Sequence, residues 1–245
     1  MRASKLLFAL LAPLASALCA AQDAPKPAAA APAPPELVQL AAALPQQPGY
    51  AKPPATRGGL PTLFTIGLTY ALANAKLRDS LPQLAQAYRK EADAGDPVAQ
   101  ASLGRMYSVG AGVPQSSEEA YKWMRKAVEN GESGAMVNLA NMYFMGTGVD
   151  KDVSEAVRWY ERAADAGDPM AMMNLGVLHT NGPGVRPNPE ESARLFRKAA
   201  ELGEPYSALG LGNAYGLGIG VAADPARSED WLRRAAAIWK DLDAR

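Results

Sequence analysis

A repeat of 36 residues constrains this chain more than any other feature of its sequence. A pattern of leucine, small residue, aromatic residue and glycine pair occurs four times between residues 96 and 239. The leucines that mark the repeats are Leu103, Leu139, Leu175 and Leu211. A period of this length is typical of stacked helical units, each too small to bury its own apolar face. The sequence therefore predicts an architecture of stacked repeats.

Each repeat is expected to contain two helices, and the first one, helix A, has clear start and stop signals. In three repeats an acidic residue precedes a proline, at Asp96, Asp168 and Glu204. The acidic side chain can cap the helix and proline fits its first turn. Glycine tolerates the left-handed backbone that ends many helices, so a glycine pair is expected to end helix A. These pairs are Gly110/Gly112, Gly146/Gly148, Gly182/Gly184 and Gly218/Gly220.

The second helix, helix B, is expected to begin directly after a polar N-cap residue. The four residues at this position are Ser116, Asp152, Asn188 and Asp224. In the first three repeats a glutamate follows three residues later, which predicts a capping box, whereas the fourth repeat has Arg227. Basic residues in the last turn of helix B complement the helix dipole. Tryptophan stands on the expected buried side in three repeats, at Trp123, Trp159 and Trp231.

These signals predict the domain organisation. A degenerate repeat is expected before the four clear ones. It lacks the glycine pair and carries Pro82, so it is expected to cap the stack. At the other end Trp239 stands where glycine would end helix B, which predicts a longer terminal helix. The predicted segments are a signal peptide (1–21), a Pro/Ala-rich disordered linker (22–57), a degenerate N-terminal repeat (58–95), repeats 1 to 3 (96–131, 132–167, 168–203), and repeat 4 with a C-terminal capping helix (204–245).

The first residues resemble a secretory signal peptide. Arg2 and Lys5 precede an apolar run from Leu6 to Leu18, and small residues follow. That run is shorter than the roughly 20 residues that a membrane-spanning helix needs. We therefore expect a periplasmic or secreted protein. Lipid anchoring through Cys19 is an alternative, although Leu18 stands before it where a small residue is usual.

Charge and residue content argue against several classes of function. Removal of residues 1–21 leaves 23 basic and 25 acidic side chains, which disfavours nucleic acid as a partner. The only histidine, His179, replaces tyrosine at a repeat position and is expected to be structural. With a single cysteine as well, no His/Cys metal site is expected. Nor does any group of residues suggest catalysis, so we predict no enzyme activity, cofactor or metal, and no transmembrane segment in the mature chain.

The repeat pattern A-x-x-x-L-G-x-x-Y-x-x-G-x-G-V, followed by a polar cap and A-x-x-W-x-x-x-A-x-x-x-G, resembles the Sel-one-like repeat family. The resemblance covers residues 96–239, with departures at His179 and at Leu195, which replaces tryptophan. The family is related to tetratricopeptide repeats. The resemblance implies an all-α fold, a right-handed α/α solenoid (superhelix) of about four repeats plus the degenerate N-terminal unit.

The resemblance also implies a function. We expect an exported, non-enzymatic scaffold or adaptor that regulates or assembles the envelope, with a partner that is an envelope or inner-membrane protein. One alternative is a structural envelope component tethered through a lipid on Cys19. Another is β-lactam binding or hydrolysis, as in a cysteine-rich branch of the family. That branch relies on paired cysteines in each repeat, which this chain lacks.

In the related superhelices helix A lines the concave face, so the partner is expected there. By the tetratricopeptide register, the candidate residues are those of helix A that point away from helix B. Apolar side chains would hold an apolar peptide or helix, and asparagine amides would hold its backbone. The predicted partner-binding residues are Arg105, Val137, Asn141, Phe144, Met173, Val177, Tyr206, Leu209 and Asn213.

Overall fold

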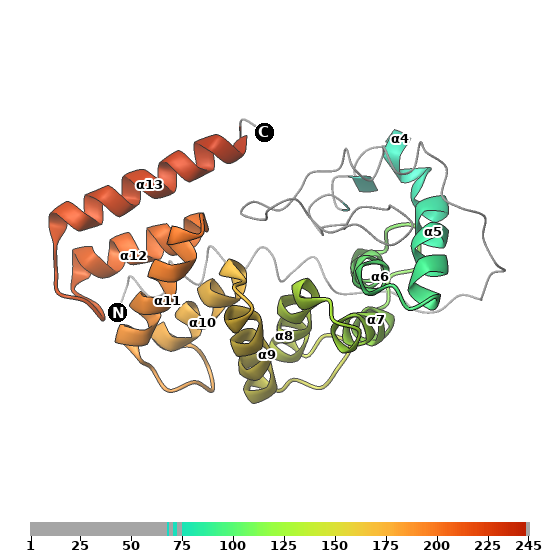
Figure 1. The fold of residues 1–245 in the computed structure, drawn as a ribbon, viewed down its shortest axis with the longest axis horizontal. Helices are drawn as coiled ribbons and strands as arrows, with labels where there is room; N and C mark the ends of the chain where they lie inside the picture. Colours follow the sequence, from blue (N-terminus) through green and yellow to red (C-terminus); the bar gives the residue numbers. More distant parts are fainter. Residues whose placement is uncertain (1–67, 69–70, 73–74, 244–245) are drawn as a thin grey trace. The chain divides into compact units, whose positions relative to one another are not determined.

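A computed structural model describes residues 68, 71–72 and 75–243 of the chain. The predicted signal peptide and linker lie outside the described residues, as does most of the first helix of the degenerate repeat. In the described part all regular secondary structure is helical (Figure 1). The elements are α4 (Ala75–Arg78), α5 (Leu81–Asp93), α6 (Pro97–Val109), α7 (Ser117–Glu129), the 3-10 helix η2 (Ser133–Ala135), α8 (Met136–Met145), α9 (Val153–Asp165), α10 (Pro169–Asn181), α11 (Pro189–Glu201), α12 (Pro205–Leu217) and α13 (Pro225–Asp243).

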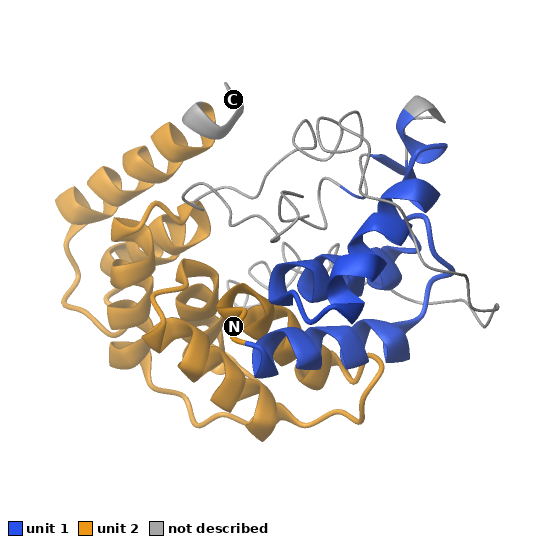
Figure 2. Ribbon diagram, turned by 45° about the vertical axis from the view of Figure 1, so that its right-hand side comes forward, with its two compact units in different colours: residues 1–46, 53–130 blue, residues 47–52, 131–245 orange. Residues whose placement is uncertain are grey.

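The described helices belong to two compact units (Figure 2). Unit 1 contains α4 to α7, and its core includes Tyr88, Leu103 and Trp123. Unit 2 contains η2 and α8 to α13, and its core includes Leu175 and Phe196. None of the described helices is long and apolar enough to span a membrane.

The predicted caps of helix A are confirmed. The Asp96 carboxylate accepts a hydrogen bond from the Ala99 backbone N–H at 2.8 Å. Asp168 and Glu204 cap α10 and α12 in the same way. The second repeat has no such acid–proline pair, and there Glu132 caps the short η2 helix that precedes α8. The local sequence therefore determines where these helices begin.

The predicted caps of helix B are confirmed, but the capping boxes are wrong. Each N-cap side chain accepts from the backbone N–H three residues later, as Asp152 does from Glu155 at 2.9 Å. In a capping box the glutamate would accept from the N-cap N–H. That N–H donates instead to a carbonyl of helix A, in the second repeat from Asp152 to Tyr143 at 2.9 Å. Each glutamate instead forms an ion pair with the basic residue three positions later in the same helix, as Glu155 does with Arg158 at 3.0 Å.

In three of the pairs the second glycine, Gly112, Gly184 or Gly220, packs against the preceding repeat. A Cβ atom on Gly112 would lie 2.2 Å from the Leu81 carbonyl oxygen, and one on Gly220 would lie 1.9 Å from that of Pro189. Leu81 and Pro189 are the first residues of α5 and α11. Because the two contacts are equivalent, α5 occupies the helix-B position of the degenerate first repeat. The other glycine of the third pair, Gly182, departs from the left-handed prediction, with φ −76°, because Pro183 follows it.

Helices A and B approach closely at the glycine that follows the marker leucine in three repeats, Gly104, Gly176 and Gly212. A Cβ atom on Gly176 would lie 2.7 Å from the Phe196 ring, and one on Gly212 would lie 2.9 Å from the Leu232 side chain. A larger residue would push the two helices apart. The sequence prediction that the small residue permits this approach is confirmed.

The bases at the end of helix B also cover the tryptophans. Lys126 lies 4.2 Å from the ring centroid of Trp123, and Arg162 lies 4.3 Å from that of Trp159. Arg234 lies over Trp231 in the same way, at 4.6 Å. Cations over aromatic rings are attracted by the ring electrons. These bases therefore have a packing role besides complementing the helix dipole.

The longer terminal helix is confirmed, since α13 has 19 residues and α11 has 13. Its added turns contain Ile238 and Trp239, which pack with Leu209 of α12. The Trp239 ring meets the Tyr206 ring edge-on, with centroids 5.4 Å apart. The extension therefore covers part of α12 where a further repeat would otherwise pack.

Candidate partner-binding face

Three predicted residues of unit 2 occupy one repeat position on successive A helices. Asn141 of α8, Val177 of α10 and Asn213 of α12 are each 36 residues apart. Asn141 and Asn213 are exposed and Val177 is half-buried. We call these three residues the helix-A row. It presents two amides and one apolar side chain to solvent.

The amide of Asn141 is partly held by the fold. The Tyr160 hydroxyl of α9 donates to the Asn141 Oδ1 atom. Burial raises the pKa of Tyr160, so this hydroxyl stays protonated and can donate at neutral pH. The Asn141 amide nitrogen can still donate to a ligand. The bond therefore orients this side chain and does not remove it from the face.

Phe144 stands one turn further along α8, at the end of the helix. It is half-buried, and Lys151 Nζ lies 5.8 Å from its ring centroid. Part of the ring contributes to the core of unit 2. Its remaining surface extends the helix-A row with an aromatic group.

Two other predicted residues lie inside unit 2. Val137 is 8% exposed and Met173 is 5% exposed. Val137 packs with the core around Leu175, and Met173 packs with Phe196 and Leu211. These side chains support the A helices from behind, where a partner does not reach them in this conformation.

Tyr206 and Leu209 of α12 face the terminal helix. Leu209 is half-buried beside Ile238 and Trp239, while Tyr206 is 49% exposed at the edge of that contact. Because α13 continues past the usual end of helix B, it contacts residues that an inner repeat would offer to a partner. Only Tyr206 of this pair keeps a large accessible surface.

Arg105 is the predicted residue that belongs to unit 1, and it is buried, at 5% exposed. Burial raises the pKa of Tyr88, and the negative charge of Glu91 adds to this rise. The positive charge of Arg105 opposes it, but the net shift is upward. Because its guanidinium is enclosed, Arg105 is part of the interior of unit 1 and not of an accessible face. The helix-A position that is exposed in α8 and α12 is therefore internal in α6.

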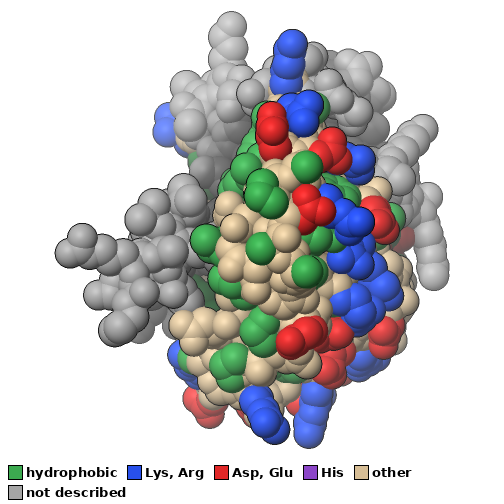
Figure 3. Space-filling view, turned by 90° about the vertical axis from the view of Figure 1, so that its left-hand side faces the viewer, with side chains coloured by type: hydrophobic (Ala, Val, Ile, Leu, Met, Phe, Trp, Pro, Cys, Tyr) green, Lys and Arg blue, Asp and Glu red, His purple; other side chains and the backbone are tan. Residues whose placement is uncertain are grey.

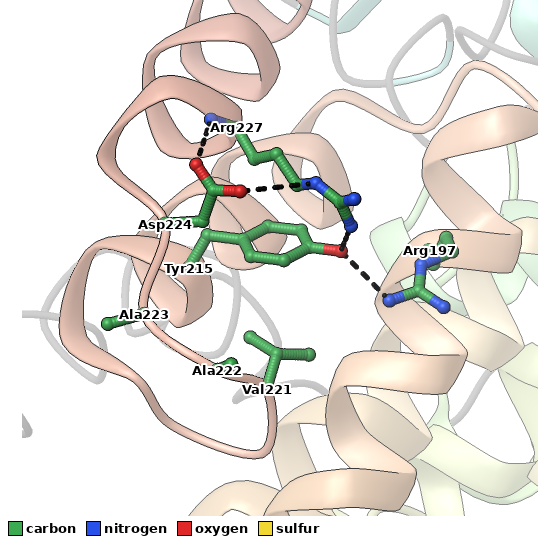
Figure 4. Close-up of a pocket in the computed structure, with 7 residues that line it drawn as sticks. All are labelled: Arg197, Tyr215, Val221, Ala222, Ala223, Asp224 and Arg227. Atoms are coloured by element: carbon green, nitrogen blue, oxygen red, sulfur yellow. Dashed lines mark hydrogen bonds and ion pairs between the residues drawn. The ribbon is translucent and has the colours of Figure 1, made fainter.

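A pocket in unit 2 was not predicted from the sequence. Its volume is about 370 Å³, and it is lined by Arg197 of α11, Tyr215 of α12, the loop residues 221–224 and Arg227 of α13 (Figure 4). Both arginines point at the Tyr215 hydroxyl (Figure 4). The sequence did contain one signal, because Arg227 stands where the other three repeats have glutamate.

The surface charges are mixed. On the face drawn in Figure 3, Lys and Arg side chains lie next to Asp and Glu side chains. Ion pairs of unit 2, such as Arg194–Glu191 and Arg234–Asp230, join side chains of opposite charge on one helix. In the part of the chain that the structure describes, no three His, Cys, Asp or Glu side chains are placed to hold a metal ion. His179 is half-buried at the end of α10.

The comparison with protein families identifies the repeat. The model of the Sel1 repeat matches residues 97–132, 133–168, 169–204 and 205–237, which together make up more than half of the chain. The chain belongs to the Sel1 repeat family. The family resemblance and the all-α solenoid of four repeats that the sequence predicted are thus confirmed. Sel1 repeat proteins are protein-interaction scaffolds, and the family is generally non-enzymatic.

Solved structures resemble this Sel1 repeat chain, among them those of two bacterial proteins. A Sel1 repeat protein from Oxalobacter formigenes is 30% identical, with a TM-score of 0.62 over 70% of this chain and 69% of that one. The protein c5321, described as a protective antigen of uropathogenic Escherichia coli with an SLR fold, is 32% identical, with a TM-score of 0.62 over 71% of this chain. The chain matches only 37% of the length of c5321. The search of curated proteins found no match.

Proposed function

We propose that this protein is an exported, non-enzymatic scaffold that binds a peptide or helix of a partner protein through its A helices. The observation that carries the proposal is the helix-A row of unit 2. Its asparagines are exposed at equivalent positions of α8 and α12, and they flank Val177 of α10. Side chains that are exposed at a periodic position suit a ligand that runs across successive repeats.

The chemistry of the row fits a peptide. An asparagine amide has both donors and an acceptor, so it can pair with the N–H and C=O groups of a peptide backbone. Val177 and the accessible part of Phe144 offer apolar contact between the amides. Binding of this kind combines backbone hydrogen bonds for affinity with side-chain contacts for selectivity.

The proposed location is the periplasm or the exterior of the cell. It rests on the sequence of residues 1–21, with its basic start and short apolar run. The mass of the mature amino terminus tests this part of the proposal. Cleavage near Ala20 or Ala21 would support a freely exported protein, and a lipid on Cys19 would favour the tethered envelope component.

Crosslinking in cells tests the binding face. A photoreactive residue at Asn141 or Asn213 is expected to capture one partner protein, because both positions are exposed. The control is the same residue at Glu161, which is exposed on helix α9. Met173 is a poor position for the probe, since it is 5% exposed. Capture from Glu161 but not from Asn141 or Asn213 would overturn the helix-A face.

A double variant provides the second test. Asn141→Arg with Asn213→Arg is expected to abolish capture of that partner by affinity purification, while the far-UV circular dichroism stays unchanged. Glu161→Arg is the matched control, because it also places an arginine on an exposed helical site. Unchanged binding by the double variant would contradict the proposal.

A further inference from the structure

Two arginines from different repeats converge on one tyrosine in the pocket of unit 2. Arg197 Nη2 donates to the Tyr215 hydroxyl oxygen at 3.1 Å, and Arg227 Nη1 donates to it at 3.3 Å. Tyr215 is 5% exposed, whereas Arg227 is exposed at the pocket rim. The hydroxyl accepts both bonds, so its own proton can be donated to a third group.

The second arginine is peculiar to the fourth repeat. In unit 1, Arg89 donates to the Tyr107 hydroxyl as Arg197 does to Tyr215, at the equivalent position. The residue equivalent to Arg227 in that repeat is Glu119, and it pairs with Lys122. The other repeats also have glutamate there. The structural contact between arginine and tyrosine thus needs one guanidinium, and Arg227 adds a second.

The charges in the pocket leave an excess of one positive charge. Arg227 is paired with Asp224, with 3.3 Å between Arg227 Nε and Asp224 Oδ2. Two guanidiniums against one carboxylate give a formal charge of +1 for the pocket-lining residues. The remaining wall is apolar, formed by Val221, Ala222 and Ala223 (Figure 4). A matching ligand would carry one negative charge on an aliphatic stem.

We propose that this pocket binds a single carboxylate of a peptide, either an acidic side chain or a free C-terminus. Each guanidinium keeps further N–H donors besides those directed at Tyr215 and Asp224, and the tyrosine hydroxyl supplies one more, so a carboxylate can accept several charged hydrogen bonds here. The aliphatic stem of the ligand packs on residues 221–223. The site is separate from the helix-A row, so the two proposals stand or fall independently.

Titration with small blocked peptides tests the pocket and distinguishes the two sources of carboxylate. The probes are Ac-Ala-Ala-Glu-Ala-Ala-NH2 for a side chain and Ac-Ala-Ala-Ala-OH for a C-terminus. Their controls are the glutamine peptide and Ac-Ala-Ala-Ala-NH2. The arginine Nε–Hε NMR signals of Arg197 and Arg227 are expected to shift saturably with at least one acidic probe. Equal shifts with its neutral control, or saturation by inorganic phosphate alone, would overturn the proposal.

Charge reversal of the added arginine provides the decisive variant. Arg227→Glu restores the residue type of the other repeats, and it is expected to weaken probe binding at least about tenfold through loss of a charged hydrogen bond. Arg233→Glu is the matched control on α13, because it makes the same charge change at an exposed site outside the pocket. We expect this control to bind within about twofold of the unchanged protein.

A second variant covers the case in which Arg227→Glu alters the fold. Arg197→Gln keeps Arg227 and removes the other guanidinium, so it is expected to weaken binding by a similar factor. Melting temperatures of all variants are measured alongside. Probe affinities within twofold of the unchanged protein for either folded pocket variant would refute the carboxylate site.

Discussion

The third and fourth repeats of unit 2 follow one plan and differ where the stack ends. Leu195 and Gly203 of the third repeat correspond to Trp231 and Trp239 of the fourth. The third repeat lies between neighbours, since α10 contacts α9 and α11 contacts α12. The fourth repeat lacks a following Sel1 match, and its helix B extends over its own helix A. An inner repeat therefore relies on its neighbours for burial, whereas in the fourth repeat α13 covers part of its own α12.

The largest expected difference between these repeats is at the residue that faces the small position of helix A. Phe196 is 5% exposed against Gly176 and Gly210, while the equivalent Leu232 is 37% exposed. Phe196→Ala is expected to lower the free energy of unfolding by about 3–5 kcal/mol, and Leu232→Ala by about 1 kcal/mol. Urea unfolding followed by circular dichroism measures both. Equal losses would show that the two repeats are buried alike.

The glycine loops should show the next largest effect. A Cβ atom on Gly220 would lie 1.9 Å from a backbone carbonyl oxygen, whereas one on Gly184 would lie 3.2 Å from the Val153 side chain. Both glycines have φ near +70°. Gly184→Ala should cost about 1–2 kcal/mol from backbone strain alone, and Gly220→Ala about 3 kcal/mol or more because a backbone must move. The same unfolding measurement decides, and a larger loss for Gly184→Ala would contradict this comparison.

The terminal extension should have an intermediate effect. Trp239→Ala removes the edge-on contact with Tyr206 and part of the cluster with Leu209 and Ile238. We expect a loss of about 2 kcal/mol, since Trp239 is half-buried. Lys240→Ala is the neighbouring exposed control, expected within about 0.5 kcal/mol of the unchanged protein. A silent Trp239→Ala would mean that the extension does not stabilise the fourth repeat.

The smallest expected effect is on the titration of Tyr215. Hydrogen bonds from Arg227 and then Arg197 lower the pKa of Tyr215, and burial opposes them. Arg227→Glu should therefore raise this pKa. NMR titration with labelled tyrosine measures it, with Arg233→Glu as the control. In the third repeat His179 stands at the position of Tyr215, and Glu191 at that of Arg227. An unchanged Tyr215 pKa in Arg227→Glu would show that Arg227 does not make the electrostatics of the two repeats differ.

The same shift predicts the direction of a stability change with pH. Because the folded pKa of Tyr215 lies below its unfolded value of about 10, the folded state releases this proton first as pH rises. Its contribution to stability is present above the unfolded pKa and is lost as pH falls through the folded pKa. Across this pH range the denaturant midpoint of the unchanged protein should rise relative to that of Tyr215→Phe. The same pH dependence in both proteins would contradict a lowered pKa of Tyr215.

The helix boundaries could be predicted because they depend on neighbouring residues. Asp96 caps α6 and Gly110 ends it in the left-handed conformation, both within one turn of the positions that the sequence indicated. The capping boxes could not be predicted in this way. A carbonyl of helix A competes for the same N–H, and that carbonyl comes near only when the two helices pack.

The sequence predicted which positions of helix A are equivalent between repeats, but not which of them are exposed. One repeat position holds Arg105, Asn141, Val177 and Asn213, yet the first is buried, the third is half-buried and the others are exposed. Whether these residues and Phe144 bind a partner stays a prediction. Their exposure depends on how the surrounding helices pack, which the residues of one repeat do not determine.

The sequence by itself determined the repeat, the family, the ends of most helices and the longer last helix, because each depends on local signals that recur every 36 residues. Only the tertiary structure decided that Met173 is core, that Leu209 lies under α13, and that Arg197 and Arg227 meet at Tyr215. These arrangements join residues of different helices. Their geometry follows from how the helices pack, which the pattern within one repeat does not contain.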